Sequence, residues 1–193
     1  MIKKRVAILI SGRGSNMQAL IEAARAADYP CAISCVISNK PEAAGLAFAQ
    51  SHNITTYVID HKNYESREAF DSALNDYLGA QKIDIVACAG FMRVMTAKLT
   101  KAWAGRMINI HPSLLPNYKG LHTHERVLAD KGVSHGCTVH FVTADLDDGP
   151  IIAQSFVPVL KDDTPDTLSS RVLVEEHKLY PQALAHVALS KNI

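Results

Sequence analysis

The stretch MINIHPSLLP, residues 107–116, predicts a short strand that ends at Pro112, because proline lacks the N–H that a ladder needs and fixes its own φ. Side chains alternate along a strand, so Asn109 and His111 are expected on one face. Open α/β sheets bind ligands at the carboxyl ends of strands. An amide beside an imidazole suits a reaction in which an oxygen becomes negative while a proton moves. Capping of a turn is the alternative role for these two side chains.

Strand-like and helix-like segments alternate through the first half of the chain. The expected strands are Arg5–Ile10, Ala32–Ile37, Thr55–Ile59, Ile83–Ala87 and Met107–Ile110. The expected helices are Ser15–Ala27, a segment from about Pro41 to Ser51, and Ser66–Leu78. Such alternation is typical of a parallel sheet that is covered by helices on both faces.

The order changes in the second half. Gly136–Val142 and Ile151–Pro158 are expected strands, and the connection between them is too short for a helix, which predicts an antiparallel pair. A final helix is expected over Thr167–Leu189, where Pro181 should kink or split it. The predicted fold class is therefore a Rossmann-like, doubly wound, mostly parallel α/β sheet with an antiparallel edge pair.

Length and composition predict one soluble globular domain over residues 1–193, with 48% hydrophobic and 20% charged residues. The net charge of +1 provides no electrostatic case for nucleic acid or an anionic membrane surface as a partner. The apolar run Val6–Ile10 is too short for a signal peptide, and no stretch has the roughly 18 apolar residues of a membrane helix. The four cysteines form no CxxC pair, so buried, reduced thiols and a cytoplasmic location are expected.

The loop SGRGSN, Ser11–Asn16, follows the first expected strand and opens a helix. Backbone N–H groups and the helix dipole hold phosphates in this setting. Met17 stands where a dinucleotide fingerprint has its third glycine, and no Walker lysine follows, so a phosphate on a smaller substrate is favoured. A plain tight turn with Ser15 or Asn16 as the helix cap is the alternative.

Two further segments carry candidate site residues. A carboxylate of the loop DLDDGP, Asp145–Pro150, could orient the imidazole of His111, although Asp-Gly-Pro is also good turn chemistry. The segment GFMRVM, Gly90–Met95, follows another expected strand and surrounds Arg93 with apolar residues. This composition suits an aromatic ligand with an anionic tail, and a buried connector is the alternative.

Several histidines lie close together in the second half of the sequence, at His122, His124, His135 and His140. A His-x-His metal site is conceivable, but no Cys or Glu ligand stands at the usual spacing. We therefore expect no metal.

Together these segments resemble the glycinamide ribonucleotide formyltransferases, the folate-dependent enzymes of purine synthesis, over essentially the whole chain. The markers are the glycine loop, Gly90-Phe91-Met92-Arg93, Asn109 through Pro116, Gly120-Leu121-His122-Thr123-His124, His140 through Thr143, and Asp147-Asp148-Gly149-Pro150. The resemblance implies a single formyltransferase domain that uses 10-formyltetrahydrofolate as co-substrate. It also implies small-molecule partners only, no metal, and a monomer or a homodimer.

The resemblance assigns roles residue by residue. It implies that Asn109, His111 and Asp147 are catalytic. It implies that Gly14, Ser15 and Asn16 hold the substrate phosphate and that Glu176 contacts the ribonucleotide. The implied folate-binding residues are Arg67, Met92, Arg93, Val94, Met95, Asn109, Thr143, Ala144, Asp145, Leu146 and Asp147.

The implied reaction transfers the formyl group to the amine of glycinamide ribonucleotide through a tetrahedral intermediate. Asn109 and protonated His111 would donate to its oxygen, and Asp147 would stabilise the imidazolium. A formyltetrahydrofolate hydrolase and a formyltransferase for charged tRNA are alternatives within the fold. Both families carry an added domain that has no counterpart in this sequence, and the tRNA enzyme would want a basic face. A non-catalytic nucleotide-binding module is the alternative from another class.

Overall fold

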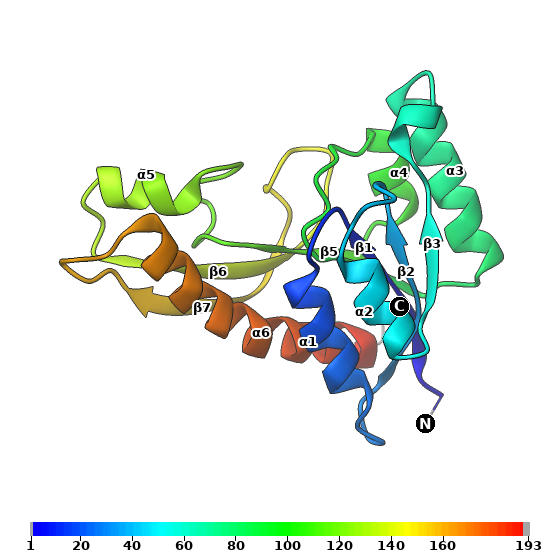
Figure 1. Ribbon diagram of the computed structural model, residues 1–193, viewed down its shortest axis with the longest axis horizontal. Coiled ribbons are helices and arrows are strands. Elements are labelled where there is room, and N and C mark those ends of the chain that lie inside the picture. The colour runs from blue at the N-terminus through cyan, green and yellow to red at the C-terminus, as the bar shows by residue number, and fades with distance from the viewer. Residues whose placement is uncertain (1, 191–193) are drawn as a thin grey trace.

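The computed structural model describes residues 2–190 and contains one seven-stranded sheet in the order β3-β2-β1-β4-β5-β6-β7 (Figure 1). The strands from β3 to β5 are parallel, whereas β6 is antiparallel to both β5 and β7. The strands are β1 (Lys4–Ile10), β2 (Cys31–Ser38), β3 (Thr55–Val58), β4 (Ile85–Cys88), β5 (Met107–His111), β6 (Ser134–Phe141) and β7 (Ile151–Pro158). The predicted mostly parallel sheet with an antiparallel edge pair is confirmed.

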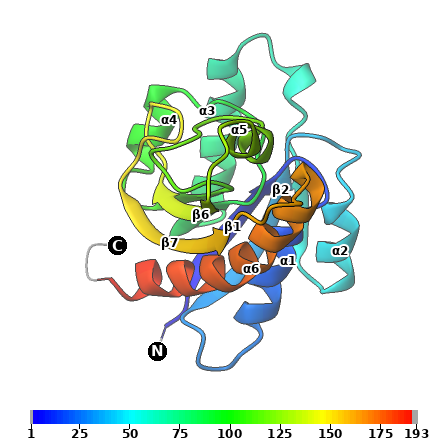
Figure 2. The same cartoon turned by 90° about the vertical axis from the view of Figure 1, so that its left-hand side faces the viewer.

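Helices cover both faces of this sheet (Figures 1 and 2). Along β1, Val6, Ile8 and Ile10 pack in a core with α1, α2 and α6, and Ala7 and Leu9 pack in a second core with α3 and α4. Alternation along a buried strand therefore produces the doubly wound arrangement. The helices are α1 (Ser15–Ala24), α2 (Gly45–Ser51), α3 (Arg67–Ala80), α4 (Ala97–Ala102), α5 (Thr123–Ala129) and α6 (Pro165–Leu189), with a 3₁₀ turn η1 (His61–Asn63).

The last helix, α6, runs through Pro181 as one element, so the predicted alternative of a split helix is wrong. Its start is set by a capping box between Thr164 and Thr167, with a proline in the first turn. Around Pro181, the buried side chains of Tyr180 and Leu184 belong to the core. Tertiary packing thus offsets the hydrogen bond that a mid-helix proline removes.

Two short helices, α4 and α5, were not predicted. Thr96 caps α4, which has 6 residues, by accepting from the N–H of Leu99. The 7-residue α5 follows His122, which has a left-handed φ of 59° and makes no side-chain cap. Helices this short carry almost no periodic signal, and packing decides whether they form.

The helix predicted from Pro41 begins later, at Gly45. A Cβ at Gly45 would lie 2.7 Å from Cδ1 of Ile10 and 3.1 Å from the carbonyl oxygen of Gly12. The N–H of Gly45 also donates to that carbonyl over 3.1 Å. A glycine is therefore needed here to let α2 support the glycine loop.

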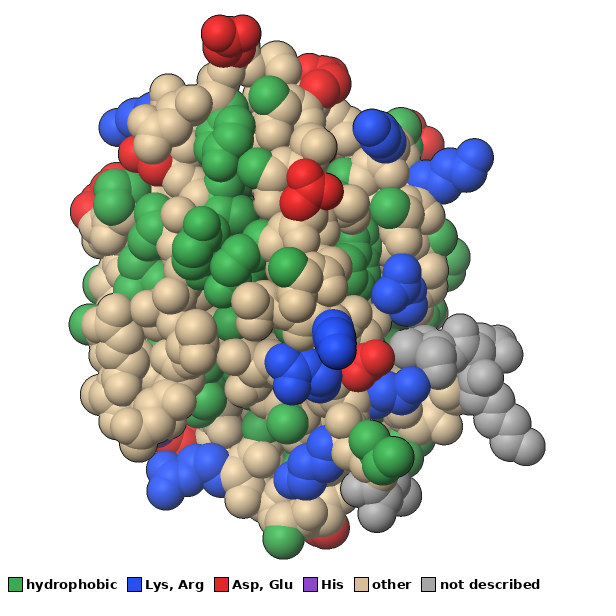
Figure 3. Space-filling model, turned by 90° about the vertical axis from the view of Figure 1, so that its right-hand side faces the viewer, with side chains coloured by type: hydrophobic (Ala, Val, Ile, Leu, Met, Phe, Trp, Pro, Cys, Tyr) green, Lys and Arg blue, Asp and Glu red, His purple; other side chains and the backbone are tan. Residues whose placement is uncertain are grey.

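The open edges of the sheet are β3 and β7. Viewed from the side of β3 and α3, hydrophobic side chains gather in the upper half of the surface, and Lys and Arg predominate among the charged side chains of the lower half (Figure 3). Tyr57 of β3 stacks on Tyr77 of α3 with ring centroids 4.1 Å apart. Side chains thus partly shield this edge.

Cys31, Cys35, Cys88 and Cys137 are all buried and unbridged, as predicted. Burial raises the pKa of the Cys88 thiol to about 12. No helix within residues 2–190 combines the length and hydrophobicity that crossing a bilayer requires.

Candidate active site

Two adjoining cavities open at the carboxyl ends of the central strands. The larger has a volume of about 670 Å³ and is lined by the start of α1, the segments that follow β4 and β5, the acidic loop and α6. The smaller, of about 110 Å³, lies between the segment that follows β4 and the acidic loop. Six residues line both cavities: Phe91, Arg93, Val94, Asn109, Leu146 and Asp147. Asn109 and Asp147 therefore lie at the junction of the two cavities.

Asn109 and His111 lie at the end of β5, as their spacing predicts. Asn109 is directly opposite His140 of β6, and its Nδ2 lies 3.2 Å from Nε2 of that ring. His111 is 5% exposed and lines the larger cavity. The chain leaves the sheet immediately after His111, so both side chains stand at the edge of the site.

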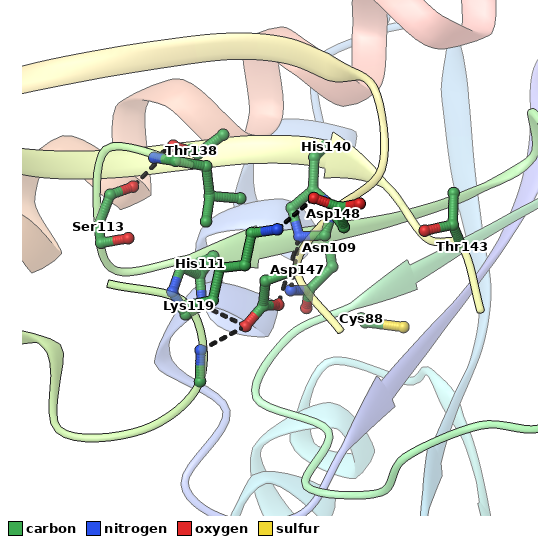
Figure 4. Close-up of polar contacts among 12 residues, drawn as sticks. Cys88, Asn109, His111, Ser113, Lys119, Thr138, His140, Thr143, Asp147 and Asp148 are labelled. Atoms are coloured by element: carbon green, nitrogen blue, oxygen red, sulfur yellow. Dashed lines mark hydrogen bonds and ion pairs between the residues drawn. The ribbon is translucent and has the colours of Figure 1, made fainter. Parts of the chain in front are cut away.

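His111 and Asp147 contact each other although they are far apart in the sequence (Figure 4). Nδ1 of His111 lies 3.3 Å from Oδ2 of Asp147, and the two side chains are 6% and 9% exposed. The other ring nitrogen, Nε2, lies 2.9 Å from the carbonyl oxygen of Tyr118. Both nitrogens thus face oxygen acceptors, which suits a doubly protonated ring. To donate to a bound ligand, the ring must exchange one of these partners for it.

Asp147 is held by contacts between two loops. Its Oδ2 accepts from the N–H of Gly120 over 2.9 Å, and its Oδ1 lies 3.7 Å from Nε2 of His140. The next residue, Asp148, forms an ion pair with Lys119, so two neighbouring contacts join the loops. Asp147 has a φ of 50°, a left-handed backbone that is uncommon for a residue with a side chain.

The glycine loop leaves the first turn of α1 without a side-chain cap. Gly14 precedes the helix with a φ of 70°, and neither Ser15 nor Asn16 caps it. The alternative of a plain capped turn is therefore wrong. Asn16 lines the larger cavity, whereas Gly14 and Ser15 are not among the lining residues.

Asn16 and Glu176 form a polar pair in the wall of the larger cavity. Nδ2 of Asn16 donates to Oε2 of Glu176 over 2.9 Å. Glu176 is 6% exposed, and burial raises the pKa of its carboxyl to about 6 despite this hydrogen bond. Oδ1 of Asn16 is buried without a partner in the described part of the chain. The pair therefore offers a carboxylate and a free acceptor to a ligand.

The predicted folate-binding residues cluster with one exception. Val94 lines both cavities, Met92 the larger and Met95 the smaller, and the smaller is also lined by Thr143, Ala144, Asp145, Leu146 and Asp147. Arg93 packs over Phe70 at 5.3 Å from the ring centroid, and its Nε is buried without a partner among the described residues. Arg67 is exposed at the start of α3 and lines neither cavity.

Several lining residues were not assigned a role in the reaction by sequence reasoning. The sequence indicates His140 only as a candidate metal ligand, and its position beside Asn109 follows from strand register against β5. From α6, Ser169, Val172 and Leu173 line the larger cavity, as do Leu121 through Glu125. Their contribution depends on how α5 and α6 pack at the mouth of the cavity, which no local pattern reveals.

The clustered histidines do not converge on one point. His122 contacts Glu125, whereas Nδ1 of His124 lies 3.1 Å from Nε2 of His135. Within residues 2–190 no group of three or more His, Cys, Asp or Glu side chains is arranged to hold a metal ion.

Similarity to known proteins shows the family to which the chain belongs. Residues 4–184 match the family described as formyl transferase. A phosphoribosylglycinamide formyltransferase from Brucella melitensis superposes with a TM-score of 0.93 at 48% identity, over 99% of this chain and 98% of the other. The phosphoribosylglycinamide formyltransferase of Haemophilus influenzae is 41% identical over 92% of this chain and 84% of its own. The bovine trifunctional purine biosynthetic protein adenosine-3 is 52% identical over 96% of this chain, which spans 18% of that protein. The chain belongs to the formyl transferase family, as its resemblance to the glycinamide ribonucleotide enzymes predicts.

Proposed function

We propose that the protein transfers the formyl group of 10-formyltetrahydrofolate to the amine of glycinamide ribonucleotide. The observation that carries this proposal is the position of Asn109 and Asp147 at the junction of the two cavities, with His111 in contact with Asp147. An acyl transfer between two small molecules needs both reactants side by side next to donors for the developing oxyanion. The names of the relatives that match over most of their length support this choice of substrates.

The larger cavity is the proposed site of the ribonucleotide. The uncapped first turn of α1, at Gly14, Ser15 and Asn16, would bind its phosphate through backbone N–H groups. Glu176 would accept from polar hydrogens of the ligand, since its carboxylate faces the same cavity. A phosphate at one end and a carboxylate along the wall would direct the amine of the ligand towards Asn109.

The smaller cavity is the proposed site of the folate ring. It has a volume of about 110 Å³ and is lined by Phe91, Val94 and Met95 of the segment that follows β4 and by the acidic loop. These apolar side chains suit a flat ring whose formyl group reaches the residues shared with the larger cavity. The proposed contacts are Met92, Arg93, Val94, Met95, Asn109, Thr143, Ala144, Asp145, Leu146 and Asp147. Arg67, outside the cavities, would pair with the carboxylates of the glutamate tail.

In the proposed mechanism the substrate amine attacks the formyl carbon and forms a C–N bond, and the formyl oxygen becomes negative. Asn109 donates to this oxygen, and one preorganised donor of this kind contributes about 2.7–4 kcal/mol. Asp147 stabilises protonated His111 and accepts the amine proton directly or through water. Collapse then breaks the bond to the folate nitrogen, which takes up a proton, so the products are the formylated amine and tetrahydrofolate.

These steps use only side chains and the folate. The formyl group is already activated on the folate nitrogen, so we expect chelators to leave the rate unchanged. The predictions of a cytoplasmic location and of a monomer or homodimer remain predictions.

The proposal is tested by incubating the purified protein with 10-formyltetrahydrofolate and glycinamide ribonucleotide and measuring both products. We expect equal amounts of tetrahydrofolate and formylated ribonucleotide, and no turnover without the ribonucleotide. Release of formate without the ribonucleotide would instead indicate a hydrolase. Binding of the ribonucleotide without any folate-dependent turnover would indicate a binding module.

A further inference from the structure

His140 is a buried imidazole next to the proposed catalytic residues, and none of the proposed steps uses it. It lies on β6 directly opposite Asn109, and a register shift between Val139 and His140 marks a bulge in the pairing with β7. Bulges re-aim side chains at the edges of active sites. The His140 side chain is 3% exposed and lines the smaller cavity, beside Asp147 and Asn109 (Figure 4).

The surroundings of His140 define where its ring proton lies. Nδ1 is 2.9 Å from the carbonyl oxygen of Phe141, which only accepts, so Nδ1 carries the proton. Burial lowers the pKa of His140, which keeps the ring neutral near pH 7. Nε2 is then an acceptor. The chain passes close to the same carbonyl at Gly149, where any Cβ would collide with the Phe141 oxygen.

An acceptor at Nε2 determines how the Asn109 amide is oriented. The atom that lies 3.2 Å from Nε2 must be the amide nitrogen, which donates one of its two hydrogens to the ring. No other hydrogen bond of this side chain occurs within residues 2–190, so the second hydrogen is free. Both nitrogens of His111 already have partners. Asn109 is therefore the neighbouring donor that is ready for a new acceptor.

We propose that His140 is a positioning residue, a neutral imidazole that holds the Asn109 amide with one free N–H directed to the formyl oxygen in the transition state. This inference rests on the proposed function of the site. Without the ring, the amide could rotate or exchange its oxygen and nitrogen, and a carbonyl oxygen facing the oxyanion would be repulsive. His140 acts through Asn109 and need not contact either substrate.

The test compares His140→Leu, Asn109→Ala and the double variant by kcat and KM for both substrates. We expect His140→Leu to lower kcat by about tenfold to a hundredfold, which is part of the loss on removing an oxyanion donor, with KM values almost unchanged. In the Asn109→Ala background the same substitution should cause no further loss, because the group that it positions is absent. If the double variant instead loses kcat by the product of the two single-variant losses, the assignment is overturned.

Two polar variants test the inference if the leucine variant does not fold. The Gln side chain of His140→Gln can place an oxygen near the position of Nε2, whereas the shorter side chain of His140→Asn cannot. We expect the glutamine variant to recover most of the rate and the asparagine variant to remain slow, with the pH profile of kcat unchanged in shape. Equal rates for the two variants, or the loss of a limb of the pH profile, would argue against positioning.

Nitrogen NMR of the histidine-labelled protein provides a readout that needs no turnover. We expect the His140 signals to show a protonated Nδ1 and an unprotonated Nε2 at neutral pH. A protonated Nε2 would overturn the inference. If the unaltered protein transfers no formyl group, the proposed function fails, and the NMR measurement still tests the hydrogen-bond arrangement. If it transfers the group but the losses multiply, only the role of His140 fails.

Discussion

Asn16 and Glu176 join the first helix to the last through a hydrogen bond of 2.9 Å in the wall of the larger cavity. The asparagine stands in the first turn of α1, and the glutamate lies in the middle of α6. The bond therefore links the proposed phosphate loop to the helix that closes the cavity. It also places a carboxylate where burial disfavours its charge.

Glu176→Gln should stabilise the protein at neutral pH and weaken binding of the ribonucleotide. Burial raises the pKa of Glu176 from 4.5 to about 6, so the folded state holds this proton more tightly than the unfolded chain. The cost of ionisation is present above pH 6 and disappears below pH 4.5, and it corresponds to about 2 kcal/mol of unfolding free energy. Urea unfolding at several pH values should give the variant a higher free energy of unfolding than the unaltered protein at pH 7.5. Near pH 4 the two free energies should be equal.

The neighbouring glutamate is a matched control. Hydrogen bonds from Lys178 and Ser155 lower the pKa of Glu175, so its charged form stabilises the fold. Glu175→Gln should therefore destabilise the protein at neutral pH. The difference in unfolding free energy between this variant and the unaltered protein should also vanish at low pH. If both variants shift stability in the same direction, burial of the Glu176 charge is not the cause.

Asp147→Asn should lower kcat by about 10² to 10³ without weakening the binding of the ribonucleotide. The amide can still accept from the Gly120 N–H, but it cannot stabilise a charged His111. Steady-state kinetics measure the loss of kcat, and calorimetric titration with the ribonucleotide measures its binding. Asp162→Asn, an exposed change outside the site, is the control. A rate near that of the unaltered protein would remove Asp147 from the mechanism.

Lys119→Met should lower kcat by up to about fivefold, because a partly exposed ion pair contributes about 0.2–1 kcal/mol. The pair with Asp148 lies next to the bond between Gly120 and Asp147 and helps to hold the two loops together. Asp148→Asn should have a similar effect, and the double variant should be no slower than either. The rate of the unaltered protein should fall with salt more steeply than that of Lys119→Met. Lys161→Met, outside the site, tests for a general charge effect.

Gly149→Ala should strongly destabilise the protein and slow the reaction. A Cβ at this position would collide with the carbonyl of Phe141, which also accepts from His140. Gly79→Ala, in α3, is the matched control, since nothing lies within 4 Å of its Cβ position. That change should raise stability by about 0.5–1 kcal/mol. Equal melting temperatures for the two variants would show that the loop around Gly149 can move to accommodate a Cβ at little cost.

Local patterns predict the sheet because each strand carries its own signal. The apolar runs of the parallel strands, the turn residues that separate them and the short connection between β6 and β7 are visible in one dimension. The short helices α4 and α5 are not, because six or seven residues do not form a helix without tertiary packing. Likewise, only packing keeps α6 in one piece at Pro181.

For the candidate site, local sequence is enough to put Asn109 and His111 on one face at the end of a strand, because alternation is a local property. The resemblance to the glycinamide ribonucleotide formyltransferases also indicates Asp147 as a catalytic residue. The contact of Asp147 with His111 and the pairing of His140 with Asn109 are visible only in the folded chain. These contacts depend on strand register and on two loops that meet, and long-range pairing leaves no periodic trace in the sequence.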